Sequence, residues 1–250
     1  MTQTKSFIIT GAASGIGAAV AQKLAGTGVE LTLHTRRNLE RLEKVAEKCR
    51  VLGAEVETVL GDLAEPGTGT AIVRAHQSRF RRLGALVANA GFPTLTGFEE
   101  MSLSEVAYAF HGNSQSFFEL AQAAHPFLTE TSEARIVAVS SFTAHVFRTD
   151  MPQFPASSAS KGAVEIAVRS LSLALAKDGI TVNCVVPGYI EKDAGTSESL
   201  SNDVLNNIKD KIPLARLGKP EDVAHMICFL LGAEAGYVSG QIIHVNGGLI

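Results

Sequence analysis

The chain has 250 residues, of which 46% are hydrophobic and 19% charged, enough for one large α/β domain or two small ones. Its formal net charge of −3 gives no electrostatic footprint for nucleic acid or for an anionic membrane surface. The three cysteines are far apart, so we expect reduced thiols in a cytoplasmic protein, with neither a disulfide framework nor a metal site. No signal-peptide pattern and no apolar run of roughly 18 residues is present, so we expect no membrane partner.

Short β-branched segments alternate with longer helical patterns along the chain, which is typical of parallel βαβ units. The predicted strands span residues 7–10, 29–34, 56–60, 85–88, 135–139, 181–186 and 242–245. The predicted helices span residues 15–25, 39–52, 70–81, 104–128 and 157–177. No linker or repeat interrupts this alternation. The sequence therefore predicts a single doubly wound α/β domain over residues 1–250.

A polar segment, residues 188–213, follows the sixth predicted strand. In open α/β sheets, ligands bind beyond the carboxyl ends of the strands. Loops at that position often close over a substrate. We therefore expect residues 188–213 to form a substrate lid.

A glycine-rich turn, Thr10-Gly11-Ala12-Ala13-Ser14-Gly15-Ile16-Gly17, connects the first predicted strand to the first helix. Its spacing is G-x-x-x-G-x-G. Glycines allow a sharp turn and a close approach of the backbone to a diphosphate, whose charge the N–H groups at the helix start can bind. Within a βαβ unit this pattern predicts dinucleotide binding. Glycines that only cap the helix are the alternative interpretation.

The end of the second predicted strand bears on the choice of cofactor. The strand ends His34-Thr35-Arg36-Arg37, and no carboxylate follows before Glu40. A carboxylate here would bind the ribose 2′-hydroxyl of NAD, whereas guanidinium groups suit a 2′-phosphate. Arg36 and Arg37 therefore favour NADP(H). A solvated basic start to the next helix is the alternative.

Further motifs follow the ends of the later strands. They are Asn89-Ala90-Gly91, Ser140-Ser141, Pro187-Gly188 and Asn246-Gly247-Gly248. With the glycine-rich turn, they make the whole chain resemble the short-chain dehydrogenase/reductase family, especially members like 3-oxoacyl-carrier-protein reductase. The resemblance implies a Rossmann-type seven-stranded parallel sheet and hydride transfer between nicotinamide and a small-molecule carbonyl or alcohol. It also implies a homotetramer.

The resemblance further implies which residues hold the cofactor. Asp62 would meet the adenine, and Asn89 the adjacent ribose region. The complete implied set is Gly11, Ser14, Gly15, Ile16, Gly17, Arg36, Arg37, Asp62, Leu63, Asn89, Ala90, Gly91, Lys161, Pro187, Gly188 and Ile190.

The implied catalytic set is Asn113, Ser141, Ser157 and Lys161. Ser141 would donate a hydrogen bond to the substrate carbonyl. Lys161 would hold the nicotinamide ribose and lower the pKa of a neighbouring acid, and Asn113 would position a water. The alternatives are a strand end whose serines satisfy their own backbone and a lysine on a solvated helix face.

Ser157 stands where the family carries a tyrosine, whose phenol supplies the proton that accompanies hydride transfer. A serine hydroxyl is less acidic and too short to reach the place of the phenol oxygen. An ordinary serine at a helix N-terminus is therefore the favoured interpretation of Ser157. The loop 142–156, which we expect to line the substrate pocket, is longer than usual and could present another group.

Other proton donors stay open. Tyr189 follows Pro187-Gly188 beside the nicotinamide region, and His145 has a suitable intrinsic pKa, although a lone loop histidine is more often a surface residue. Tyr108 and Tyr237 are poorly placed. Water or the substrate itself is a further possibility. Where the family carries a threonine that contacts the nicotinamide amide, this chain has Glu191-Lys192-Asp193, and Lys192 could supply charge instead.

The sequence thus favours an NADP(H)-dependent oxidoreductase with an atypical active site. A catalytically weak NADP(H)-binding protein and a non-redox dehydratase or isomerase are the alternatives. The predicted helix 157–177 is apolar around much of its circumference, and the chain ends in Leu249-Ile250. More apolar surface than one sheet can cover predicts a homo-oligomer.

Overall fold

The computed structural model describes residues 5–91, 94–191 and 207–249. Seven parallel strands form one sheet in the order β3-β2-β1-β4-β5-β6-β7. The predicted seven-stranded parallel sheet is confirmed. The strands are β1 (Ser6–Ile9), β2 (Glu30–Thr35), β3 (Glu55–Leu60), β4 (Ala85–Ala88), β5 (Arg135–Val139), β6 (Thr181–Pro187) and β7 (Ile242–Val245).

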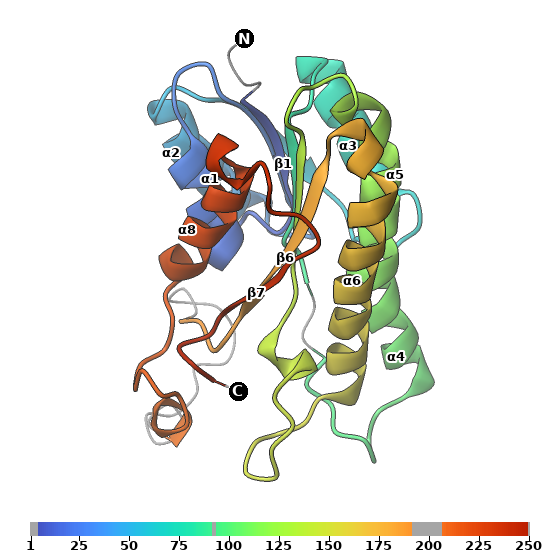
Figure 1. Ribbon diagram of the computed structural model, residues 1–250, viewed down its shortest axis with the longest axis vertical. Coiled ribbons are helices and arrows are strands. Elements are labelled where there is room, and N and C mark those ends of the chain that lie inside the picture. Colours follow the sequence, from blue (N-terminus) through green and yellow to red (C-terminus); the bar gives the residue numbers. More distant parts are fainter. Residues whose placement is uncertain (1–4, 92–93, 192–206, 250) are drawn as a thin grey trace.

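Helices cover both faces of the sheet (Figure 1). One layer is α1 (Gly15–Leu24), α2 (Leu39–Val51) and α8 (Pro220–Leu231). The opposite layer is α3 (Thr68–Phe80), α5 (Ser116–Leu128) and α6 (Pro155–Ala174). Alternate residues of one strand point to opposite faces, so in β5 Val137 packs in the core beneath the first layer and Ile136 in the core beneath the second. We had predicted no helix at residues 220–231, although Pro220 and Glu221 are typical first-turn residues.

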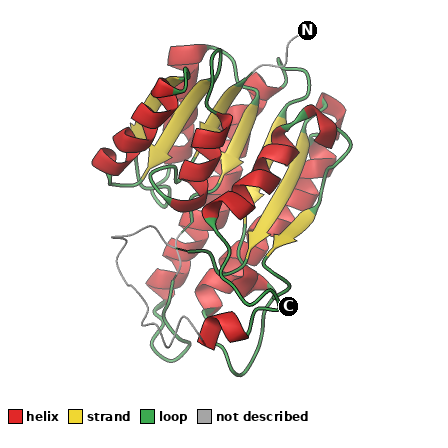
Figure 2. Ribbon diagram, turned by 90° about the vertical axis from the view of Figure 1, so that its left-hand side faces the viewer, coloured by secondary structure: helices red, strands yellow, loops and turns green. Residues whose placement is uncertain are grey.

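Between β1 and β4 the order of the strands reverses, since β1 pairs with β2 on one side and with β4 on the other. In open α/β sheets such a switch point opens a crevice at the carboxyl ends of the strands. Figure 2 shows loops and short helical segments gathered at that end of the sheet, close to the C-terminus. Within the described residues, no helix is long and apolar enough to cross a bilayer.

The predicted helix 104–128 is interrupted, and that prediction was wrong in this respect. A π-helical turn, His111–Gln115, separates α4 (Leu103–Phe110) from α5. The extra residue of a π turn disturbs an apolar pattern too little to be seen in sequence, and such turns are frequent at functional sites. The predicted helix 157–177 begins earlier, at Pro155, and ends at Ala174, before a 3₁₀ turn, Ala176–Asp178.

Candidate active site

The glycine-rich turn and the segment after β4 form one hydrogen-bonded unit at the switch point. Thr10 Oγ1 accepts hydrogen bonds from the backbone N–H groups of Asn89 (3.1 Å) and Ala90 (3.0 Å). Asn89 Nδ2 donates to the carbonyls of Thr10 (2.9 Å) and Gly11 (3.2 Å). A Cβ at Gly17 would lie 2.3 Å from the carbonyl oxygen of Gly11, so only glycine fits there. Asn89 therefore holds the turn in shape, a contact that the sequence did not predict.

The backbone at the start of α1 suits an anionic group. Ser14 precedes the helix with an extended backbone, φ −164°, and its hydroxyl makes no capping hydrogen bond. Gly15 and Ile16 open the helix, so their N–H groups belong to the turn whose dipole attracts negative charge. This geometry fits the diphosphate of a dinucleotide.

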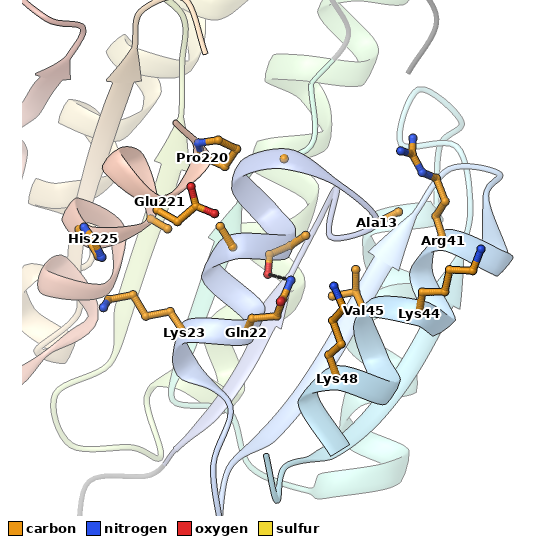
Figure 3. A pocket seen from close by; sticks show the side chains of 14 residues that line it. Ala13, Gln22, Lys23, Arg41, Lys44, Val45, Lys48, Pro220, Glu221 and His225 are labelled. Carbon is orange, nitrogen blue, oxygen red and sulfur yellow. Dashed lines mark hydrogen bonds between the residues drawn. The ribbon is translucent and has the colours of Figure 1, made fainter. Parts of the chain in front are cut away.

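A basic groove of about 610 Å³ runs between α1, α2 and α8 (Figure 3). At one end it reaches Ala13 and Gly15 of the glycine-rich turn. Its cations are Lys23, Arg41, Lys44 and Lys48, against one carboxylate in its lining, Glu221. One of these cations, Lys44, is paired with Glu40 at 2.6 Å.

The two arginines after β2 differ in their surroundings. Arg37 is exposed, while the Arg36 side chain is 37% exposed and turns toward the end of β3. Arg36 Nη1 donates to Tyr108 Oη at 2.6 Å, and Tyr108 donates to Asp62 Oδ2 at 3.0 Å. The other oxygen of Asp62 accepts from the N–H of Ala64 at 3.0 Å. Tyr108, which we had set aside as a proton donor, therefore contacts two predicted cofactor residues.

Lys161 is buried, so a solvated lysine on a helix face is excluded. Its Nζ donates to the carbonyl oxygen of Val139 at 2.8 Å. Burial lowers the pKa of Lys161 to about 8, because an ammonium loses its hydration there. A Cβ at Gly91 would lie 2.5 Å from Nζ, so a larger residue at position 91 would displace the end of the lysine side chain. The lysine is thus held where the ends of β4 and β5 meet.

Asn113 lies beside this lysine, buried in the π turn. Its Nδ2 donates to Ser160 Oγ at 3.0 Å, which ties the turn to α6. Asn113 and Lys161 also line a cavity of about 10 Å³. That volume is about the size that one water requires. The structure therefore brings Asn113, Lys161 and Gly91 together.

Ser141 follows β5 in extended backbone, with φ −155°. Its Oγ accepts hydrogen bonds from the N–H (3.2 Å) and the hydroxyl (3.0 Å) of Thr143. The expected alternative, a serine that satisfies its own backbone, is therefore present in part. In both bonds Ser141 is the acceptor, so its own O–H proton can be donated to a carbonyl.

Ser157 lies in the first turn of α6, one turn before Lys161, and is only 5% exposed. Residues four apart lie on the same face of a helix. Within the described part of the chain, the Ser157 hydroxyl has no hydrogen-bond partner, although its carbonyl accepts from Ser160 Oγ at 3.1 Å. Ser157 is therefore more enclosed than an ordinary serine at a helix N-terminus.

The pair of His145 and Glu165 was not predicted. His145 Nε2 lies 2.8 Å from Glu165 Oε2, and Ser140 Oγ donates to the same buried carboxylate. The ring of His145 also meets that of His244 edge-on, with centroids 4.4 Å apart. Successive residues of extended chain point in opposite directions, so Ser140 and its partners lie on the other side of the chain from Ser141. Glu165 could have been suspected as a charged residue one turn after Lys161 on the same helix face.

Tyr189 packs in a small apolar cluster. Its ring is tilted by 40° against that of Phe142, with centroids 4.4 Å apart, beside Val146, Met151 and Leu249. Burial raises the pKa of Tyr189, which makes its phenol a weaker acid.

The expected lid is described only at its two ends. Gly188 packs on Asn246, since a Cβ at this glycine would lie 2.8 Å from Cα of Asn246. Ile190 forms an isolated β-bridge with Gly218. Residues 192–206, which include Lys192, lie outside the described residues.

Comparison with known proteins agrees with this architecture. The model of the family Enoyl-(Acyl carrier protein) reductase matches residues 11–250. The chain belongs to the short-chain dehydrogenase/reductase family of oxidoreductases. It is 31% identical over 249 residues to a 3-oxoacyl-(acyl-carrier-protein) reductase FabG of Staphylococcus aureus, covering 100% of this chain and 99% of that protein.

Solved structures of similar proteins share the fold. A short-chain dehydrogenase from Burkholderia cenocepacia, in complex with NADP, superposes with a TM-score of 0.89 and is 28% identical, covering 99% of this chain and 98% of that one. The angucycline C-6 ketoreductase LanV, with bound NADP, has a TM-score of 0.88 and 27% identity, covering 99% of this chain and 96% of that one.

Proposed function

We propose that the protein is an NADP(H)-dependent oxidoreductase that transfers a hydride between nicotinamide and the carbonyl or alcohol of a small molecule. The observation that carries this proposal is the buried ammonium of Lys161 beside Gly91 and Asn113. Burying a cation is costly, so a chain without a use for it gains by losing it. NADP(H) is supported by the two arginines after β2 and by the NADP complexes of relatives.

The residues of this chain fit such a cofactor. The tightly folded glycine-rich turn and the start of α1 would hold its diphosphate, and Lys161 the nicotinamide ribose. When bound, the cofactor supplies or accepts the hydride. Ser141 would donate its O–H to the substrate oxygen and so orient the carbonyl. The remaining requirement is a proton for the oxygen of the reduced substrate.

We propose that this proton comes from Lys161 through a water. With a pKa of about 8, the Lys161 ammonium gives up its proton more readily than an ordinary lysine and recovers it from solvent. Ser157, on the same helix face, offers a hydroxyl to hold such a water. Asn113, at the small cavity beside Lys161, would continue the path of the proton to solvent. Tyr189 and His145 have weaker support, because their side chains are engaged elsewhere.

A catalytically weak NADP(H)-binding protein is the second candidate. Serine at position 157 favours it, because loss of general acid–base catalysis slows a reaction by about 10²–10⁴-fold.

The test combines binding and turnover. In fluorescence titrations we expect NADPH to bind at least about tenfold more tightly than NADH, the effect of about one charge-assisted hydrogen bond to a 2′-phosphate. With NADPH, the protein should reduce activated ketones, and Lys161→Met should lower that rate by about 10²-fold or more. Circular dichroism would verify that the variant folds.

Lys177→Met, at an exposed lysine in the 3₁₀ turn after α6, is the matched control. It should change neither the affinity for NADPH nor the rate of ketone reduction. Tight NADPH binding without turnover of any ketone would favour the second candidate. Absence of nucleotide binding would overturn both.

A further inference from the structure

Glu165 is a buried carboxylate that takes no part in the proposed path of the proton. It lies on α6 four residues after Lys161, and residues four apart share one face of a helix. Both residues are only 7% exposed. Removing a single charge from water is costly, and an opposite charge nearby offsets part of that cost. The placement of the two side chains therefore points to an interaction between their charges.

Hydrogen bonds from two residues hold the Glu165 carboxylate in place. Ser140 Oγ donates to Oε1, and His145 Nε2 lies 2.9 Å from Oε1 and 2.8 Å from Oε2. Donors around a carboxylate stabilise its negative charge, and a neutral imidazole donates its N–H without cancelling that charge. Ser140 Oγ is also 3.3 Å from the carbonyl oxygen of Lys161. The end of β5 thus fixes the carboxylate against the helical turn that carries Lys161.

Other ionisable groups on the neighbouring strands do not supply a negative charge. Cys184 on β6 lies close to Lys161, but burial raises the pKa of its thiol to about 12, so the thiol is neutral. His244 on β7 meets the ring of His145 edge-on, and neither imidazole is an anion. The carboxylate of Glu165 is therefore the group that offsets the buried ammonium from this side.

The helical elements that pack against α6 supply no other anion. Their titratable groups are Glu105, at the capped start of α4, Tyr108, whose hydroxyl donates to Asp62, and His111, which is exposed in the π turn. Arg169, further along α6, is exposed as well. Within the described ranges of the chain, Glu165 is thus the carboxylate whose charge acts on the lysine.

We propose that Glu165 is the counter-ion of Lys161, a positioning residue that keeps the lysine protonated where the ends of β4 and β5 meet. Burial lowers the pKa of Lys161 to about 8, and the negative charge of Glu165 opposes that effect. The catalytic meaning of this role rests on the proposed function. There Lys161 passes its proton through a water to the oxygen of the reduced substrate, and it must be protonated again before the next turnover. Glu165 thus widens the pH range over which the proton is available.

Direct titration of Lys161 tests the charge effect without cofactor or substrate. In protein that is isotope-labelled at the lysine Cε, the NMR signal of Lys161 is assigned by its absence in Lys161→Met. Glu165→Gln keeps the size of the side chain and removes its charge, so the titration midpoint of Lys161 should fall by about one pH unit, the lower end of the effect of a nearby opposite charge. Glu165→Met removes the same charge without an amide and should give the same shift. Glu130→Gln, at an exposed glutamate after α5, is the matched control and should leave the midpoint unchanged.

The pH profile of turnover connects this charge to the reaction. With NADPH, Glu165→Gln should reduce activated ketones at pH 6 within about twofold of the wild-type rate and at pH 8 about fivefold more slowly, as a midpoint lower by about one pH unit requires. Glu165→Asp, which restores the charge, should bring the profile back toward that of the wild type. Circular dichroism would verify that the variants fold.

An unchanged or higher titration midpoint of Lys161 in the neutral variants would overturn the role of Glu165 as counter-ion. A lower midpoint in a protein that reduces no ketone would support that role and contradict the proposed function instead.

Discussion

We propose that Ser157, in the first turn of α6, stands where the family carries a tyrosine and is too short to take over the role of the phenol. Ser157→Tyr should place a phenol beside Lys161, whose charge lowers the pKa of a neighbouring acid. We expect the reduction of activated ketones with NADPH to rise by about 10²-fold or more. Initial rates at saturating NADPH measure the gain. The affinity for NADPH should change little, because the glycine-rich turn is untouched.

The other two candidate donors give the control for that result. Tyr189→Phe and His145→Ala should each leave the wild-type rate nearly unchanged, since Tyr189 stacks on Phe142 and His145 pairs with Glu165. If either substitution removes turnover, that residue is the donor, and the added ring in Ser157→Tyr would then clash and not help.

Contacts between side chains were the part of the site that sequence could predict least. Gly91 and Lys161 meet because the carboxyl ends of neighbouring parallel strands lie at one edge of the sheet. Tyr108 lies 72 residues from Arg36 in the chain, and no local sequence pattern predicts their contact. The pairing of His145 with Glu165 depends on the rotation of α6, which sequence periodicity gives only approximately.

At the scale of elements, His76 connects α3 to the sheet by hydrogen bonds. Its ring nitrogens form hydrogen bonds with Ser6 Oγ (3.1 Å) on β1, Thr32 Oγ1 (2.8 Å) on β2 and the carbonyl of Arg82 (2.8 Å). Burial lowers the pKa of His76 from 6.5 to about 4, because a buried imidazole resists protonation. The neutral ring is therefore part of the folded structure.

The lowered pKa of His76 predicts that the folded protein loses stability over a defined range of acidic pH. Between about pH 6.5 and pH 4 the unfolded chain binds a proton at His76 and the folded chain does not, so the stability that is full above pH 6.5 is lost as the pH falls. The loss amounts to about 3 kcal/mol by pH 4, at about 1.4 kcal/mol for each tenfold difference in proton affinity.

Urea unfolding at pH 7 and pH 5 measures this effect. His76→Gln should be less stable at pH 7 but should lose less stability on acidification than the wild type. His225→Gln, at an exposed histidine on α8, should behave as the wild type does. An identical acid sensitivity in the His76 variant and the wild type would contradict the assignment.

The elements themselves were largely predictable, since each observed strand lies within a few residues of its predicted range. Strands that are buried on both faces form short, β-branched runs, which sequence shows clearly. The π turn could not be predicted, because one extra residue leaves the apolar spacing of α4 and α5 helix-like on both sides.

At the scale of the whole molecule, part of the apolar surface of α6 is left uncovered. Val164 and Val168 are buried against the sheet, whereas Ile166 is 66% and Leu173 is 81% exposed. Residues seven apart lie on one face of a helix, so these two side chains form a stripe. Leu249 is buried within the chain, so the C-terminal pair no longer supports an oligomer.

We propose a homo-oligomer, specifically a tetramer, built in part on this stripe. The double variant Ile166→Glu and Leu173→Glu should lower the molar mass measured by light scattering at micromolar concentration, because charge cannot be buried cheaply in an apolar contact. Leu103→Glu, at an 86% exposed leucine on α4, is the control. A monomeric wild-type protein would contradict the proposal.

The π turn at residues 111–115 also limits how the gene can change in length. Loss of a single codon there would let α4 run into α5 as one regular helix, with each residue advancing by about 100°. Either Asn113 would swing away from Ser160, or Phe117 and Leu120 would rotate out of the core. We therefore expect natural selection to remove deletions in this stretch. Substitutions on the outer faces of the same helices should be tolerated.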